Sequence, residues 1–214
     1  MNFKLTKQWL KSFIMMVIAV IIMGLGVSLF VLVNLGTDPC SSMNYGVARQ
    51  LGISFGNYQL IFNIVLLIIV IIFDRSLIGT GTLGNMVLVG YSADFFSFIW
   101  NDVLKINPDL TIAARIGILI PALIVFVIAA AVYMNSGRGT APYDSVPLII
   151  CSKLEKATGK KDLFKPVRLS FDLIAMIIGF FTGGEVGIMT VLMVILLAPT
   201  VSYVGHLFER KGII

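Results

Sequence analysis

The sequence predicts an all-α polytopic membrane protein that has six transmembrane helices plus two short half-helices and is built from two inverted repeats. One observation behind this prediction is composition: the 214 residues are 58% hydrophobic and 13% charged, with a mean hydropathy of +0.99. Soluble domains carry about 25% charged residues. The other is a polar phrase that occurs twice between apolar segments, as GTDPCSSM at 36–43 and GTAPYDSV at 139–146. Such recurrence indicates a duplicated unit.

Six apolar segments are candidates for membrane crossings, because a bilayer core of about 30 Å requires about 20 apolar residues per helix. The first, 12–33, is too long for a signal peptide and lacks a small-residue cleavage site, so we expect it to be retained. The other five are 58–73, 81–100, 116–134, 167–182 and 187–207. The second and fifth have only 16 residues, or about 24 Å of helix. They therefore need flanking residues or begin inside the membrane.

Each copy of the polar phrase opens a predicted half-helix, at 39–51 and at 142–154. Thirteen residues of helix span about 20 Å, which is too short to cross a bilayer. Asp38 suits the N-cap position and Pro39 the first helical position, where its missing N–H costs nothing. The sequence leaves open whether these half-helices enter the membrane or lie on its surface.

The duplication extends beyond the phrase, since YQLIFNIVLLII at 58–69 matches VRLSFDLIAMII at 167–178. We expect one membrane domain over 1–214, with repeat one at about 12–100 and repeat two at about 116–208. Each repeat contains three crossings, so the second copy starts from the opposite side of the membrane. Inverted repeats with a short element at matching positions are typical of secondary transporters, whose sites lie at the repeat interface.

The distribution of Lys and Arg predicts that both termini are cytoplasmic. With that orientation, thirteen of the sixteen basic residues lie inside and three outside, in agreement with the positive-inside rule. The inside set is Lys4, Lys7, Lys11, Arg75, Arg138, Lys153, Lys156, Lys160, Lys161, Lys165, Arg168, Arg210 and Lys211, and the outside set is Arg49, Lys105 and Arg115. Because the basic residues flank apolar segments, we interpret them as topology signals and exclude nucleic acid as a partner.

Arg168 and Asp172 are the most informative charges, because their i, i+4 spacing places them on one helix face inside a predicted span. Their counterparts in the first repeat are Gln59 and Asn63, so the two faces are expected to line one polar cavity. The alternative is an Arg168 that extends to the cytoplasmic interface with Asp172 as its local partner. The other candidate substrate-binding residues are polar groups near the half-helix starts and in the third span: Thr37, Asp38, Ser41, Thr82, Asn85, Thr140 and Asp144. Helix capping and helix packing are the competing interpretations for these.

Two stretches, GLGVSLFVLVNLGTDPC at 24–40 and GTLGNMVLVG at 81–90, resemble the YczE/YitT-type family of bacterial integral membrane proteins. Members show a GxGxxLxxxxxLGTDPW opening and a later GTxxNxxxxG segment, and Cys40 stands where the family has an aromatic residue. The matching residues are Gly24, Gly26, Gly36, Thr37, Asp38, Pro39, Thr82, Asn85 and Gly90. The resemblance covers nearly the whole chain. It implies a multi-pass protein of the bacterial cytoplasmic (inner) membrane and supplies no substrate.

The function that these observations favour is small-solute transport through a polar site at the interface of the two repeats. The lipid bilayer and an unknown small solute are the expected partners, and a homo-oligomer or an energising subunit stays open. Two alternatives remain: a non-transporting accessory or scaffold protein, and a substrate-binding membrane subunit with separate energising partners. We expect no enzyme activity, because the single histidine, His206, lies at the end of the last span and no catalytic motif occurs. Cys40 and Cys151 have no companion ligands, so we expect no metal and no cofactor.

Overall fold

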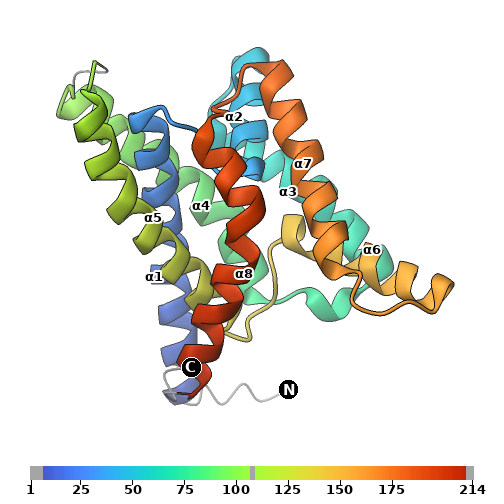
Figure 1. Ribbon diagram of the computed structural model, residues 1–214. Helices are drawn as coiled ribbons and strands as arrows, with labels where there is room; N and C mark the ends of the chain where they lie inside the picture. Colours follow the sequence, from blue (N-terminus) through green and yellow to red (C-terminus); the bar gives the residue numbers. More distant parts are fainter. Residues whose placement is uncertain (1–6, 107–108, 211–214) are drawn as a thin grey trace.

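The computed structural model describes residues 7–106 and 109–210. In this part of the chain every element of regular secondary structure is a helix. The prediction of an all-α chain is therefore confirmed. The α-helices are α1 (Lys7–Val33), α2 (Pro39–Leu51), α3 (Phe55–Phe73), α4 (Thr80–Phe98), α5 (Ile112–Met134), α6 (Pro142–Thr158), α7 (Phe164–Thr182) and α8 (Ile188–Arg210). A 3-10 turn, η1 (Arg75–Leu77), precedes α4, and a π-helical turn, η2 (Ile99–Val103), follows it. Figure 1 shows their arrangement.

The first predicted half-helix matches α2 residue for residue, and the second is longer than predicted. Asp38 caps α2 through a bond from the Ser41 backbone N–H, and Gly52 ends the helix in the left-handed region at φ 67°. The helix α6 has 17 residues instead of 13 and continues to Gly159, which is also left-handed at φ 69°. Residues 155–158 contain no helix breaker, so the helix ends only where glycine permits the turn.

The two short predicted spans are lengthened at their starts. Both α3 and α7 begin three residues earlier than the apolar segments do, and each has 19 residues. A helix of 19 residues is about 29 Å long, which is close to the thickness of the bilayer core. The flanking residues 55–57 and 164–166 therefore supply the missing length, which is one of the two alternatives that the sequence left open.

The long helix α1 is the centre of one half of the molecule and packs against both α4 and α5. Its approach to α4 depends on Gly24, where an added Cβ would lie 2.6 Å from the Ser92 Cβ. Against α5 it packs Phe30, whose ring centroid lies 5.4 Å from that of Phe126. These buried contacts form an apolar core, which fixes α1, α4 and α5 relative to one another.

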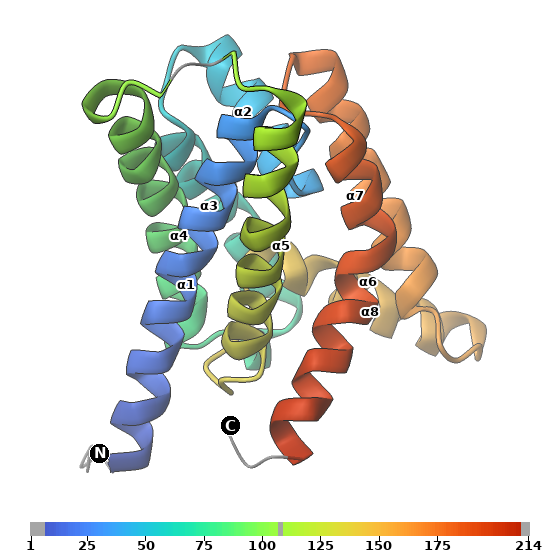
Figure 2. The same ribbon diagram turned by 60° about the vertical axis from the view of Figure 1, so that its left-hand side comes forward.

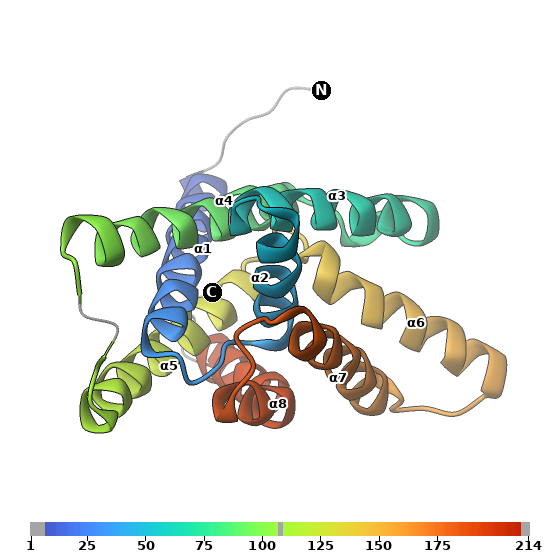
Figure 3. The ribbon, with the colours of Figure 1, turned by 90° about the horizontal axis from the view of Figure 1, so that it is seen from above.

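The half-helices are held by the remaining helices, α2 against α7 and α6 against α3. Figures 1 and 2 show α2 in the upper part of the molecule and α6 in the lower part. The view from above in Figure 3 shows α6 and α7 standing away from the α1–α4–α5 group. The start of α1 and the end of α8 lie at the same end of the molecule. Lys4 and Lys211, which entered the topology prediction, lie outside the described residues.

Two matching hydrogen-bonded contacts, here called the exchange junctions, join each polar phrase to a helix start in the other half of the chain. In the first, Thr37 N donates to Glu185 O at 2.9 Å and Met189 N donates to Leu35 O at 3.0 Å. Thr190 Oγ1 accepts from Gly187 N at 3.1 Å. The loop before α2 is thus bonded to the start of α8.

The second exchange junction repeats this pattern with the halves reversed. Thr140 N donates to Leu77 O at 3.0 Å, and Gly81 N donates to Arg138 O at 2.6 Å. Thr82 Oγ1 accepts from Gly79 N at 3.0 Å. The loop before α6 is thus bonded to the start of α4. In both loops a glycine with positive φ, +99° at residue 36 and +93° at residue 139, makes the close approach possible.

The outer surface is rich in large apolar side chains. Ile72, Phe180 and Phe181 are more than 65% exposed, and many other Ile, Leu and Phe side chains of α3, α5 and α7 are also exposed. Soluble proteins rarely expose apolar surface so extensively. Among the described residues, three helices have the length and hydropathy of membrane spans: Trp9–Val33, Phe55–Phe73 and Ile112–Met134.

Candidate functional site

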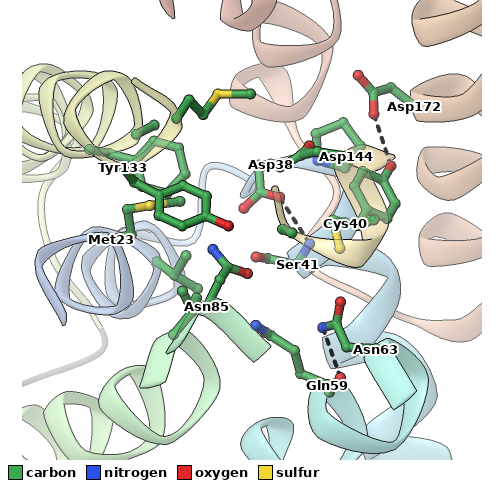
Figure 4. Close-up of a pocket in the computed structure, with 18 of the residues that line it drawn as sticks. Met23, Asp38, Cys40, Ser41, Gln59, Asn63, Asn85, Tyr133, Asp144 and Asp172 are labelled. Atoms are coloured by element: carbon green, nitrogen blue, oxygen red, sulfur yellow. Dashed lines mark hydrogen bonds between the residues drawn. The ribbon is translucent and has the colours of Figure 1, made fainter. Parts of the chain in front are cut away.

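A cavity of about 310 Å³ lies at the centre of the molecule, where the two half-helices begin. Figure 4 shows the side chains that converge on it. Helices α1, α3, α4, α5 and α7 and the first turns of α2 and α6 line it, at Met23, Val27, Asp38, Pro39, Cys40, Ser41, Gln59, Asn63, Asn85, Val89, Phe126, Ala130, Tyr133, Met134, Asn135, Ala141, Tyr143, Asp144, Phe164, Arg168 and Asp172.

Eight of the eleven residues selected from the sequence line this cavity. They are Asp38, Ser41, Gln59, Asn63, Asn85, Asp144, Arg168 and Asp172. The other three, Thr37, Thr82 and Thr140, are absent from the lining and belong to the exchange junctions. Thr37 and Thr82 are fully buried there, and the backbone groups of Thr37 and Thr140 and the hydroxyl of Thr82 form the junction bonds. For these three positions the competing interpretation, that they serve helix ends and packing, describes the structure better.

The ionic part of the site is built around Arg168. Its Nε donates to Asp172 Oδ2 at 2.8 Å and its Nη1 donates to Asp144 Oδ1 at 2.6 Å. Tyr143 Oη donates to the second oxygen of Asp172 at 2.8 Å. The guanidinium therefore joins α7 to the first turn of α6, and only 12% of its side chain is exposed. Arg168 pairs with Asp172 and lines the cavity, as the sequence-based prediction had it, and does not extend away from the cavity as in the alternative.

Asp38 faces this group from the start of α2, and its two oxygens differ. Oδ1 accepts a hydrogen bond from Ser41 N at 3.0 Å, which is the N-cap bond of α2. Oδ2 is buried and has no hydrogen-bond partner among the described residues. In Figure 4 the carboxylate points into the cavity, toward the same space as the Tyr133 hydroxyl.

Neutral amides cover the side of the cavity formed by α3 and α4. Asn63 Nδ2 donates to Gln59 O at 2.9 Å, one turn earlier in α3. Asn63 Oδ1 is left without a partner among the described residues, as is Tyr133 Oη of α5. Asn85 of α4 points into the same space in Figure 4. The first-repeat side chains thus supply dipoles where their second-repeat counterparts, Arg168 and Asp172, supply charges.

The remaining wall is apolar and comes from α1, α4 and α5. Met23 and Val27 of α1, Val89 of α4 and Phe126 of α5 contribute its main side chains. The cavity therefore has one ionic and one hydrocarbon side. Ligand pockets commonly combine a mostly apolar lining with a few well-placed polar groups.

Tyr143, Cys40 and Tyr133 line the cavity but were not among the candidate binding residues chosen from the sequence. For two of them the sequence contains a pattern that could have identified them. Tyr143 and Cys40 occupy the same place in the repeated phrase, directly after its proline, so alignment of the copies contained the signal. Tyr133 lies in a long apolar helix whose pattern did not separate a cavity face from a packing face. Among the described residues there is no cluster of His, Cys, Asp and Glu suited to a metal ion.

An all-helical chain with an apolar surface and a buried polar cavity is a membrane protein. It belongs to a family of unknown function, DUF6198, whose model matches residues 10–206. It is similar to the uncharacterised membrane protein YczE of Bacillus subtilis (strain 168), with 29% identity over 177 residues that cover 82% of this chain and 77% of the relative. These matches confirm the resemblance to a YczE-type membrane protein family.

Two further relatives are also uncharacterised proteins. The uncharacterised protein YyaS of Bacillus subtilis (strain 168) is 25% identical over 182 residues, which cover 84% of this chain and 85% of the relative. An uncharacterised protein of Haemophilus influenzae (strain ATCC 51907 / DSM 11121 / KW20 / Rd) is 24% identical over 200 residues, or 94% of this chain and 86% of the relative. No solved structure matches the chain.

Proposed function

We propose that the protein transports a small solute across the bacterial cytoplasmic membrane, without enzyme activity, through a site between two inverted repeats. The observation that carries this proposal is a single cavity lined by corresponding side chains of both halves. Gln59 and Asn63 line one side, and Arg168 and Asp172 line the other. A scaffold protein would need no such polar interior, which is expensive to place inside a membrane.

The repeat architecture is supported by the exchange junctions and by helix direction. Each junction uses the same loop and helix-start positions, with the halves interchanged. In Figure 1, α1 runs upward and α5 downward, while α2 and α6 occupy opposite ends of the molecule. A two-fold axis in the membrane plane relates halves in this way, and transporters built on it bind their substrates near the midplane.

Six crossings follow when α4, α7 and α8 are added to the three strongly apolar helices. The two shorter ones, α4 and α7, have 19 residues, or about 29 Å of helix, and α8 has 23, or about 35 Å. Their lower hydropathy is explained by the polar residues that line the cavity or form the exchange junctions. With six crossings both termini lie on one side, which the basic residues assign to the cytoplasm.

Flux into reconstituted vesicles tests the proposal. Purified protein is inserted into liposomes and uptake of a panel of radiolabelled cations, anions and amino acids is compared with uptake by empty vesicles. Asp172→Asn is expected to abolish or change uptake, because it leaves the Arg168 charge with Asp144 alone. Asp74→Asn is the control for loss of a carboxylate, since Asp74 caps η1 and lies outside the cavity.

Wild-type uptake no greater than that of empty vesicles across the panel would contradict transport, and would favour the accessory or scaffold protein that the sequence left open. Normal uptake by Asp172→Asn would instead contradict the assignment of this cavity as the transport site.

A further inference from the structure

Three buried oxygens of the cavity lack hydrogen-bond partners among the described residues. They are Asp38 Oδ2, Asn63 Oδ1 and Tyr133 Oη. The exposed fractions of these residues are 8%, 2% and 1%. Buried polar atoms are hydrogen-bonded in the great majority of cases, so an unpaired group in a cavity indicates a missing partner.

The missing partner has to donate hydrogen bonds. A carboxylate oxygen and an amide oxygen only accept, and a phenol oxygen accepts as well as donates. The cationic donor of the lining, Arg168, is already engaged by Asp144 and Asp172. A ligand with several N–H groups would satisfy these oxygens, whereas a second carboxylate would face acceptors.

The formal charge of the lining also favours a cation. Three carboxylates, Asp38, Asp144 and Asp172, and one guanidinium line the cavity, which sums to −3 + 1 = −2. Leaving buried charges unpaired costs several kcal/mol per ion. An anionic solute would increase this imbalance, and a monovalent cation reduces it.

The hydrocarbon wall favours an organic cation over a metal ion as the ligand. Met23, Val27 and Phe126 contribute no oxygen ligands, whereas a cation such as Ca²⁺ takes about 6–8. A volume of about 310 Å³ is at the low end of the range for ligand pockets, about 300–1,000 Å³. The space therefore suits a small molecule that has one charged end and one apolar end.

We propose that the solute is a small organic ammonium ion. Its ammonium group donates to Asp38 Oδ2 and Tyr133 Oη, and its apolar body lies against Met23, Val27 and Phe126. Asn63 Oδ1 accepts from any further donor that the solute carries. This inference rests on the proposed function only in assigning the cavity as the solute site.

Binding of n-butylammonium tests it in a way that does not require transport. Calorimetric titration of the purified full chain in lipid nanodiscs compares this probe with butyrate, 1-butanol and NaCl. We expect n-butylammonium to bind. The other three probes are expected neither to bind nor to compete with it. Asp38→Asn keeps a good N-cap residue and is expected to weaken binding at least about tenfold, as for loss of a charge-assisted hydrogen bond. Asp74→Asn is expected to leave binding unchanged.

A second variant keeps the test decisive if Asp38→Asn does not fold. Tyr133→Phe removes only the hydroxyl of a buried ring and is expected to weaken binding about two- to tenfold. The proposal is overturned if n-butylammonium does not bind, if butyrate or 1-butanol binds as well, or if Na⁺ displaces the probe. It is also overturned if all folded variants bind like wild type. Binding of n-butylammonium without flux would contradict only the proposal that the protein is a transporter. Flux of an anion without ammonium binding would contradict only the proposal that the solute is an ammonium ion.

Discussion

At the scale of single residues, the three cavity carboxylates have different surroundings. Both oxygens of Asp172 are bonded, one by Arg168 and one by Tyr143. Asp144 accepts a hydrogen bond from Nη1 of Arg168, and Asp38 accepts one from the backbone N–H of Ser41. A single guanidinium therefore compensates two carboxylates. Exchanging the charges of residues 168 and 172 would not preserve the site, because a carboxylate at 168 would then face Asp144.

Arg168→Met is expected to lower the stability of the protein strongly. It leaves two buried carboxylates without their cation, and breaking a buried pair in this way typically costs about 3–5 kcal/mol. Arg168→Lys is expected to rescue only part of the loss, because one ammonium does not reproduce the two-branched geometry. Unfolding in mixed micelles, followed by circular dichroism, gives the stabilities.

Arg49→Met is the control for this measurement. Arg49 also forms an ion pair, with Glu185, but its side chain is 61% exposed. Pairs of this kind contribute about 0–1 kcal/mol. Equal losses in Arg168→Met and Arg49→Met would show that the cavity network does not stabilise the fold.

Asp38→Ala is expected to destabilise the protein by about 0.5–2 kcal/mol, since it removes the side-chain cap of α2. Asp38→Asn retains an acceptor for the Ser41 N–H and removes a buried charge, so its stability is expected to be near that of wild type. Thermal unfolding of the two variants side by side measures the difference. Similar losses in both would show that the charge of Asp38, and not its capping bond, stabilises α2.

The sequence predicted those site residues whose type is unusual in a membrane span. Arg168, Asp172, Gln59 and Asn63 are polar within apolar segments and correspond between repeats. Thr37, Thr82 and Thr140 are polar for a different reason, since they form the exchange junctions, and residue type alone did not distinguish the two uses. Phe126 and Tyr133 are typical of apolar helices, so only the three-dimensional packing reveals that they face a cavity.

At the scale of helices, boundaries were predictable where the chain carries a stop or start signal. The bounds of α2 follow from Asp38, Pro39 and Gly52. The starts of α3 and α7 lie three residues earlier than predicted, because Gly56 and Pro166 were treated as the ends of the apolar segments although both lie in the first turns of these helices. The pairing of each polar phrase with a distant helix start was not predictable, because it joins residue 37 to residue 185 and residue 140 to residue 77, far apart in the sequence.

The exchange junctions are expected to contribute equally to stability. Thr82→Val and Thr190→Val each remove the hydroxyl that accepts from Gly79 N or Gly187 N. An unpaired buried N–H costs about 1–3 kcal/mol. Because the two threonines share no partner, the double variant is expected to lose the sum within about 0.5 kcal/mol.

Thr158→Val is the control, since Thr158 lies at the exposed end of α6 and its hydroxyl bonds only to the nearby backbone groups Leu154 O and Lys160 N. Its effect is expected to stay within about 0.5 kcal/mol. Chemical denaturation of all four variants in one micelle system provides the comparison. A negligible effect of either junction variant would mean that its N–H finds another acceptor.

At the scale of the whole molecule, the proposed inverted arrangement of the halves predicts which residues are accessible from each side of the membrane. In a background with Cys40→Ser and Cys151→Ala, single cysteines are placed by Ser54→Cys and Thr158→Cys. Both positions are exposed; Ser54 ends the loop that follows α2, and Thr158 is the last residue of α6. A membrane-impermeant maleimide is expected to label residue 54 only from outside intact cells and residue 158 only after the inner face is opened.

Labelling of both positions from the same side would exclude the inverted arrangement and the six-crossing topology together. Both variants must contain as large a fraction of folded protein as wild type does, measured by size-exclusion chromatography in detergent. A misfolded chain would be labelled without regard to topology.

The exchange junctions also constrain the order in which a ribosome can complete the structure. When α1 to α4 have been synthesised, the acceptor Leu35 O and the donor Thr37 N still await α8 and the turn before it. A buried peptide group left unpaired costs about 1–3 kcal/mol. The nascent chain therefore holds its first half in an incomplete state until the last described helix is inserted. A protein truncated before α8 would keep these groups open and present a clear substrate for membrane proteases.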